Sequence, residues 1–108
     1  MARITLLARV TVYLKVDIVD RDRCFKPDWP TVFLELPSGD RFTTVEANVD
    51  KESFWGPKCR ELIEGGIGRW MLREGYAPWK GGKPPKFEVD YVGERWFRVK
   101  ACVASTSK

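Results

Sequence analysis

Residues 31–47 read TVFLELPSGDRFTTVEA, two strand-like runs on either side of a turn. Residues 31–36 and 41–47 are rich in β-branched and aromatic side chains, which favour strands over helices. The intervening PSGD combines a proline with Gly39, which accepts a positive φ, and such residues typify tight turns. The stretch therefore predicts a β-hairpin.

A strand is also predicted before this hairpin. The apolar residues of positions 10–18 stand at every even position, with Thr, Tyr, Lys and Asp between them. This period of two predicts a strand with one buried face. The run extends back to Ile4 with a bend around Leu7 and Ala8, where the alternation slips. We expect this long first strand to offer a free edge to a partner.

The end of the chain carries a second hairpin signal. Residues 87–92 and 95–103 alternate in the same way, and Gly93-Glu94 between them suits a two-residue turn.

The remaining segments divide into loops and helices. Residues 20–30 are predicted to be a loop, because Pro27 and Pro30 disfavour both a helix and the hydrogen-bonded pairing of a β-sheet. A helix, or two short ones, is expected within residues 48–64 and is predicted to end at Gly65-Gly66. Another helix is expected at residues 67–74, followed by an irregular segment at residues 76–86.

These elements predict an α+β fold with a largely antiparallel five-stranded sheet. One or two short helices are expected between the third strand and the C-terminal hairpin. The sheet is either open, which we favour, or curled into a partly closed barrel. Residues 1–104 are expected to form a single domain, and residues 105–108 a frayed polar tail.

The composition argues against several classes of function. The chain has 108 residues with no histidine, which excludes histidine-based nucleophile activation and imidazole metal ligands. Its three cysteines form no C-x-x-C pair, so we expect no metal site, no cofactor and no catalytic residue that a motif would reveal. An odd number of cysteines, no signal peptide and no long apolar run indicate a cytoplasmic protein without a membrane partner.

The positive charge is concentrated in the second half of the chain. Residues 57–108 hold 11 Lys and Arg against 6 Asp and Glu, although the net charge of the whole chain is +4. Basic groups beside an aromatic ring suit a nucleic acid or another anion, since they offer charge for phosphates and a ring for a base. The residues predicted for such a site are Arg69, Arg73, Trp79, Lys80, Lys83 and Lys86.

Several tryptophans fall where a core residue is not expected. Trp29 lies in a predicted loop, Trp55 at the end of a predicted element, and Trp96 out of phase with the apolar face of the last strand. Rings at such positions indicate either a surface for a ligand or protein partner, or a second covered face of the sheet.

The favoured hypothesis is a small non-enzymatic binding module that associates with itself, as a dimer, or with another protein. The first alternative is a nucleic-acid-binding protein that uses the basic and aromatic residues above. The second is a small enzyme with a carboxylate pair, for which Glu61 with Glu64, or Glu88 with Asp90, are the candidates.

Overall fold

The structure, a computed structural model, describes residues 3–8, 14–57, 59–79 and 84–103, without the side chains of residues 3 and 101–103. Its elements are β1 (Arg3–Ala8), β2 (Leu14–Val16), α1 (Ile18–Cys24), β3 (Thr31–Ser38), β4 (Arg41–Asn48), α2 (Glu52–Trp55), β5 (Glu61–Leu62), α3 (Gly65–Arg73), β6 (Lys86–Gly93) and β7 (Trp96–Val103).

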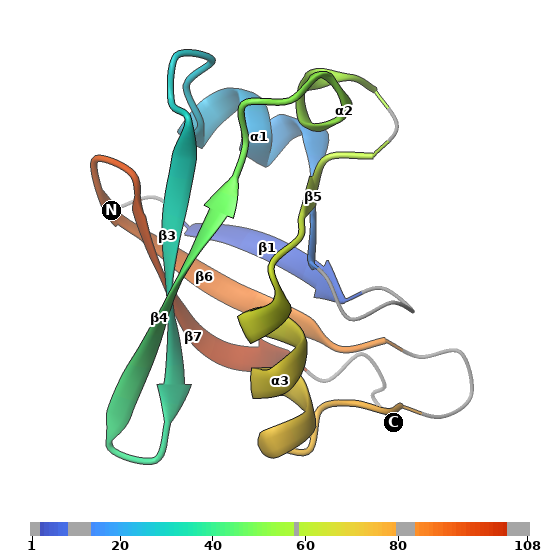
Figure 1. Cartoon of the computed structure of the whole chain (residues 1–108), viewed down its shortest axis with the longest axis vertical. Coiled ribbons are helices and arrows are strands. Elements are labelled where there is room, and N and C mark those ends of the chain that lie inside the picture. The colour runs from blue at the N-terminus through green and yellow to red at the C-terminus, as the bar shows by residue number, and fades with distance from the viewer. Residues whose placement is uncertain (1–2, 9–13, 58, 80–83, 104–108) are drawn as a thin grey trace.

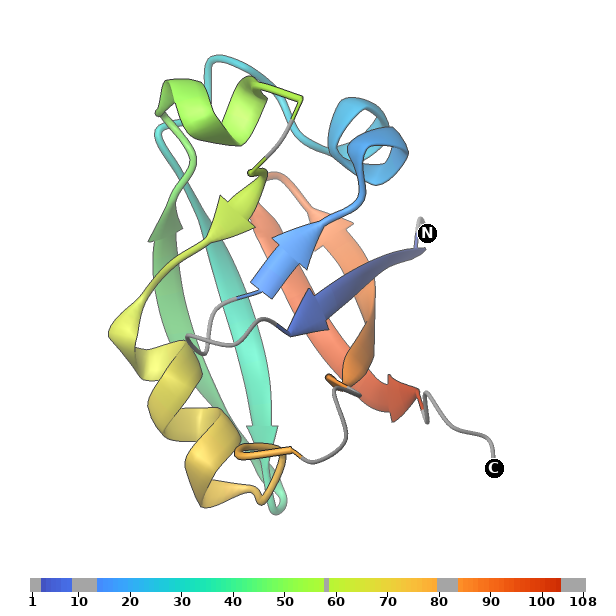
Figure 2. The same cartoon turned by 90° about the vertical axis from the view of Figure 1, so that its right-hand side faces the viewer.

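The strands form one sheet in the order β4-β3-β7-β6-β1-β2-β5. Neighbouring strands are antiparallel except β3 and β7, which are parallel. The sheet curves until it is nearly closed into a barrel, with β4 and β5 as its two edges (Figures 1 and 2). The predicted number of five strands and the favoured open sheet are therefore wrong. The largely antiparallel pairing and the alternative of a partly closed barrel within an α+β fold are supported.

The N-terminal region contains two of the strands rather than one. Leu6 of β1 stands opposite Val16 of β2 in an antiparallel pair, so the chain reverses between them and the single bent strand predicted here is wrong. Part of that prediction, residues 10–13, lies outside the described residues, as does the predicted tail at residues 105–108. The predicted free edge of the first strand is wrong as well, because β1 lies between β2 and β6. Alternation reports which face of a strand is buried, but it does not report which strands are its neighbours.

Helix α1 occupies part of the segment that was predicted to be a loop. Asp17 begins it, since its carboxylate accepts a hydrogen bond from the backbone N–H of Val19 at 3.0 Å. The helix then buries Arg21 and Cys24 on one face and leaves Ile18 exposed. The apolar residue at position 18 therefore does not continue the buried face of the preceding strand.

Two short helices lie between β4 and β6, as predicted, but their limits differ. Helix α2 has only four residues, and Leu62, expected on a helix, lies in β5 opposite Leu14. Gly65 begins α3 rather than ending a helix, because the Glu64 carboxylate caps the N–H of Gly66 at 2.6 Å. Both predicted hairpins are present, and the turn between β3 and β4 uses Gly39 at a φ of 67°.

Aromatic side chains fill both ends of the barrel interior. Phe25 stacks on Phe97 with ring centroids 4.7 Å apart and also contacts Phe54, close to α1 and α2. At the end near α3, Trp70 lies 5.3 Å from Phe87. Figures 1 and 2 show α1 and α2 together at one end of the barrel and α3 beside the other.

A buried arginine joins α1 to α2. Arg21 is 6% exposed, and its guanidinium donates hydrogen bonds to the carbonyls of Phe54 at 3.0 Å and Gly56 at 2.8 Å. The guanidinium also lies 5.2 Å from the centre of the Trp55 ring. A four-residue helix has little stability of its own, so this side chain fixes α2 in place.

We predict that Arg21→Met lowers the free energy of unfolding by about 2–3 kcal/mol, because two carbonyls lose their donor in a poorly solvated site. Urea denaturation measures the change. Arg23→Met is the control, since Arg23 makes an exposed ion pair with Asp20 and its loss should cost no more than about 1 kcal/mol. Equal losses for the two variants would contradict this role of Arg21.

Candidate functional site

Strand β4 presents an unpaired backbone edge. Within the described part of the chain, β3 is the only strand that pairs with β4. Phe33 donates its N–H to Arg95 beside β7, so its backbone faces away from β4, whereas Val49 donates to Pro30 across the β3–β4 ladder. Hydrogen-bonded and non-bonded pairs alternate in an antiparallel ladder. The N–H and C=O groups of Phe42, Thr44 and Glu46 therefore point to the free edge.

Helix α3 packs against β4 at its start and against the end of β3 farther along, so it runs in the opposite direction to β4. Near its start, a Cβ atom on Gly66 would lie 2.7 Å from Cγ1 of Val45, so the helix backbone lies against the Val45 side chain here. Further along, the indole N–H of Trp70 donates to the carbonyl of Pro37 at 2.7 Å. Beyond the helix end, the Glu74 carboxylate accepts a hydrogen bond from the hydroxyl of Ser38 at 3.0 Å.

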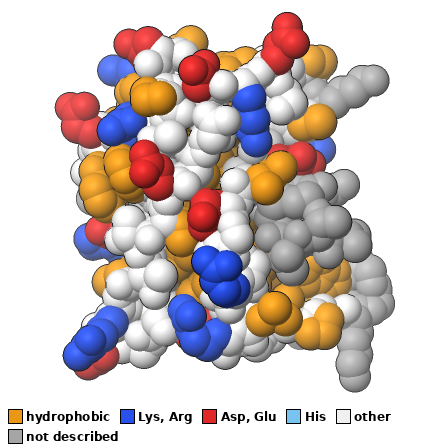
Figure 3. Space-filling view, in the orientation of Figure 1, with side chains coloured by type: hydrophobic (Ala, Val, Ile, Leu, Met, Phe, Trp, Pro, Cys, Tyr) orange, Lys and Arg blue, Asp and Glu red, His pale blue; other side chains and the backbone are white. Residues whose placement is uncertain are grey.

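A groove of about 430 Å³ lies between the helix and the strand. Its lining consists of Thr43, Thr44, Val45 and Glu46 from β4, and of Glu64, Gly66, Arg69 and Arg73 on or beside α3. Figure 3 shows Lys and Arg side chains over the part of this face where α3 lies. The groove thus combines free backbone donors and acceptors on one wall with two arginines on the other.

The acidic side chains of the groove already have partners. The Glu64 carboxylate caps α3, and the Glu46 carboxylate accepts a hydrogen bond from the Thr31 hydroxyl at 2.6 Å. Arg73 lies 3.5 Å from the carboxylate of its chain neighbour Glu74, with half of its side chain exposed. Arg69 is exposed and makes no ion pair with any described residue. An anionic group is therefore the natural complement of the helix wall.

An aromatic patch continues from β4 across the outer face of the sheet. Trp96 of β7 is 37% exposed and stacks on Phe33 of β3 with ring centroids 4.5 Å apart. Phe42 of β4 is 49% exposed and lies 5.1 Å from the guanidinium carbon of Arg98. Arg98 in turn pairs with Glu35 at 2.6 Å. A strand added to β4 would extend the sheet face that carries this patch.

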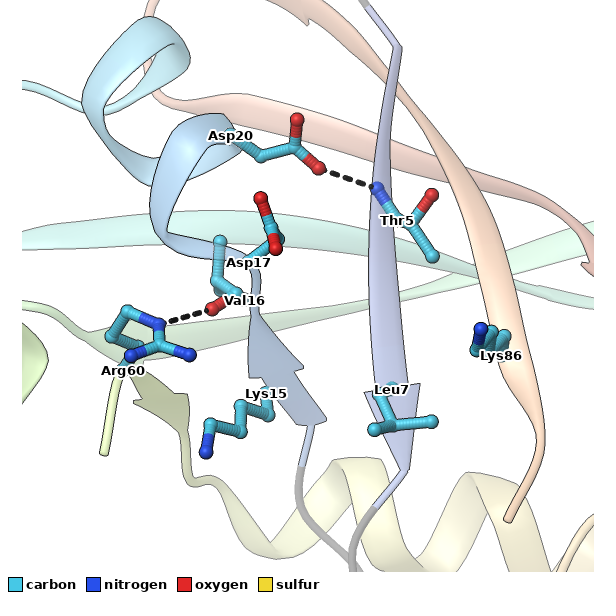
Figure 4. A pocket seen from close by; sticks show the side chains of 8 residues that line it. All are labelled: Thr5, Leu7, Lys15, Val16, Asp17, Asp20, Arg60 and Lys86. Carbon is cyan, nitrogen blue, oxygen red and sulfur yellow. Dashed lines mark hydrogen bonds between the residues drawn. The ribbon is translucent and has the colours of Figure 1, made fainter. Parts of the chain in front are cut away.

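A second hollow, of about 570 Å³, lies where β1 and β2 separate near α1 (Figure 4). Its lining comprises Thr5, Leu7, Lys15, Val16, Asp17, Asp20, Arg60 and Lys86. The acids lie toward α1, and the two lysines lie on either side of Leu7.

Most charged groups of this second hollow hold the backbone in place. The Asp20 carboxylate accepts a hydrogen bond from the N–H of Thr5 at 3.1 Å, where β1 extends beyond its pairing with β2. Arg60, at a φ of 53°, donates from Nε to the carbonyl of Val16 at 2.8 Å. Asp17 caps α1. Among the described charged residues of this hollow, Lys15 and Lys86 make no such backbone contact, so they are the cations that would attract an anion there.

The structure divides the predicted basic site between two places. Arg69 and Arg73 share the groove, whereas Lys86 lines the second hollow. Trp79 is partly buried against the core. Lys80 and Lys83 lie outside the described residues.

The three tryptophans predicted to meet a partner have different surroundings. Trp29 is buried in the core. Trp55 packs against the core and donates its indole N–H to the carbonyl of Val49 at 3.0 Å. Trp96 keeps an exposed ring surface on the outer face of the sheet.

Sequence reasoning missed the strand wall of the groove. Thr43, Thr44 and Glu46 were assigned to a strand, but nothing in their pattern marks that strand as an edge, because strand order depends on distant segments. A usable signal was Gly66, since adjacent glycines at a helix start often mark a close approach of backbone to a neighbour.

Catalytic chemistry receives little support from the titratable groups. No cluster of three or more metal-ligating side chains occurs among the residues that the structure describes. Of the predicted carboxylate pairs, Glu64 serves as a helix cap and Asp90 lies 3.9 Å from the Lys100 ammonium. Burial raises the pKa of Tyr91 above its ordinary value, with smaller contributions from Glu94 and Cys24.

Comparison with protein-family models, with curated proteins and with solved structures found no match. Of the helices that the structure describes, none combines the length and the apolar character that crossing a membrane requires.

We predict that Gly66→Ala lowers the free energy of unfolding by about 1–3 kcal/mol, because the new methyl group collides with the Val45 side chain and with the Glu64 carboxylate that caps the helix, so the helix start has to move away from β4. Gly65→Ala is the matched control. Its methyl group would meet the flexible guanidinium of Arg69 at 3.1 Å, so the change should stay within about 0.5 kcal/mol. Urea denaturation of both variants measures the difference, and equal stabilities would contradict the close packing of α3 on β4.

Proposed function

We propose that this protein is a non-enzymatic interaction module that binds an extended strand of a partner protein along β4, in the groove beside α3. The observation that carries the proposal is the unpaired edge formed by the backbone of Phe42, Thr44 and Glu46. An extended peptide that adds to an open sheet edge gains main-chain hydrogen bonds, and a neighbouring pocket supplies specificity for its side chains.

The surroundings of this edge support a binding role. Soluble proteins usually protect an exposed edge with charges, proline or a short strand, because free edges aggregate. Strand β4 has eight residues, and the only charged ones are Arg41 and Glu46. Helix α3 flanks the edge and leaves a groove beside it, so a partner strand would be held on one side by backbone and on the other by side chains.

A second copy of the chain is one partner that could use the edge, and self-association as a dimer remains a prediction. Sedimentation velocity over a range of concentrations tests it. A concentration-dependent dimer that Thr44→Pro abolishes would assign self-pairing to β4.

The decisive variant for strand addition is Thr44→Pro. The N–H of Thr44 points to the free edge, so proline removes a donor for the partner without removing a bond to β3. Panning of a phage-displayed library of linear peptides against the wild-type protein is expected to enrich extended peptides. We predict that Thr44→Pro weakens their binding by about tenfold or more, since a lost hydrogen bond and a steric block act together.

Thr43→Pro provides the contrast, because Thr43 donates within the β3–β4 ladder. This variant should lose about 3 kcal/mol of stability, whereas Thr44→Pro should keep its fold. A library that yields no binder, or binders that tolerate Thr44→Pro, would contradict the proposal.

Nucleic-acid binding is the alternative that the basic side chains favour. Lys15, Arg60 and Lys86 line one hollow, while Arg69 and Arg73 line the other. This alternative predicts that a labelled single-stranded oligonucleotide binds, that added salt weakens the binding, and that Lys86→Glu weakens it further. Fluorescence anisotropy at two salt concentrations tests it, and an absence of binding at low salt would remove it.

A further inference from the structure

We infer that the partner strand carries two acidic side chains at alternate positions, Glu or Asp at i and i+2, which pair with Arg69 and Arg73. This inference rests on the proposed strand addition to β4 and specifies what the added strand contains. The helix wall of the groove, rather than the β4 edge, would set this preference.

The spacing of the two arginines matches the spacing of side chains along a strand. Arg69 and Arg73 are four residues apart on α3, which places them on one helix face about 6 Å apart along the axis. Side chains at i and i+2 of a strand lie on one face about 6.7 Å apart. Because Arg69 and Arg73 line the same groove as residues 43–46 of β4, a strand added to β4 would direct one row of its side chains toward both arginines.

The electrostatics of the groove favour carboxylates in that row. Arg69 has no ion pair with a described residue, and Arg73 contacts the acid that follows it in the chain. The acids of the groove are engaged elsewhere, Glu64 at the helix cap and Glu46 with Thr31. A guanidinium forms two parallel hydrogen bonds with a carboxylate, which gives both strength and orientation.

The guanidinium of Arg69 is placed by the glycine at the start of the helix. Its Nη1 would lie 3.1 Å from a Cβ atom on Gly65, so the side chain lies back over the first turn of α3, the direction that helical side chains take. The exposed position of Gly65 leaves room for this arrangement beside the groove.

A second copy of β4 does not supply this pattern. Its alternate rows read Phe42, Thr44, Glu46, Asn48 and Arg41, Thr43, Val45, Ala47, so neither row contains two acids. Charge complementarity therefore favours a different protein segment, with acids at i and i+2.

The test uses fluorescein-labelled synthetic peptides and anisotropy. TTETETT carries the proposed spacing, TTTEETT has the same composition with adjacent acids, and TTKTKTT has the opposite charge. We expect TTETETT to bind at least about fivefold more tightly than TTTEETT, and TTKTKTT not to bind. Arg69→Gln and Arg73→Gln should each weaken binding of TTETETT by about tenfold.

Two controls accompany these variants. Arg23→Gln removes the same charge from α1, at the other end of the barrel, and should leave the affinity within about twofold. Thermal melts establish that the arginine variants fold like the wild-type protein. An oligo-dT competitor added to the bound peptide tests whether any polyanion suffices.

Each other outcome overturns the inference. Equal binding of TTETETT and TTTEETT would mean that only net charge matters, and displacement by oligo-dT would mean that the site accepts phosphates. Strong library binders that lack acids, ignore both arginine variants and are lost in Thr44→Pro would refute the acidic pattern while leaving strand addition intact. Absence of any peptide binding, in the library as well, would remove both.

Discussion

The structure depends on the packing of α3 into the opening between the two edges of the sheet. Strand β5 ends at Leu62, and the helix begins three residues later at Gly65. At Gly66 the helix backbone touches Val45 of β4, at the opposite edge. Trp70 then fills the interior and donates its indole N–H to the carbonyl of Pro37. A side-chain contact thus joins edges that no ladder joins among the described residues.

Because a helix rather than a strand closes the barrel, strand β4 keeps a free edge at the surface. In a fully hydrogen-bonded barrel, no strand would keep a free edge. Here the helix covers the interior beneath β4 but does not replace a strand beside it. Among the residues that the structure describes, no strand therefore pairs with the outward N–H and C=O groups of Phe42, Thr44 and Glu46. The same helix carries Arg69 and Arg73 along the groove. The packing of α3 against the sheet therefore contributes both to the stability of the fold and to the proposed binding site.

Much of the fold was predictable where structure follows from local pattern. The hairpins at β3–β4 and β6–β7 were predicted correctly, because alternation and turn residues act over short distances. The pairing of β1 with β2 was not, since the apolar alternation of the N-terminal region suits one long strand equally well. Helix α1 was missed because Asp17 reads as the polar face of a strand, although it caps a helix. The two residues of β5 are too few to show any periodicity.

The candidate site was predictable in part, for the same reason. The spacing of Arg69 and Arg73 is local, and the sequence predicted a helix at residues 67–74 that contains both. Their position opposite β4 depends on the strand order, which long-range contacts determine. Trp29 illustrates the opposite case, because a ring in a predicted loop proves to be buried against Phe25 and Tyr91.

Amide hydrogen exchange along β4, measured by NMR with and without TTETETT, tests the central claim most directly. In the free protein, the amides of Thr43, Val45 and Ala47 should be protected by β3, while those of Phe42, Thr44 and Glu46 should exchange quickly. Adding the peptide should protect the second set and leave the first unchanged. Two results would contradict strand addition at this edge. The first is protection of the Phe42, Thr44 and Glu46 amides before any peptide is added. The second is continued rapid exchange of these amides when the protein is saturated with a bound peptide.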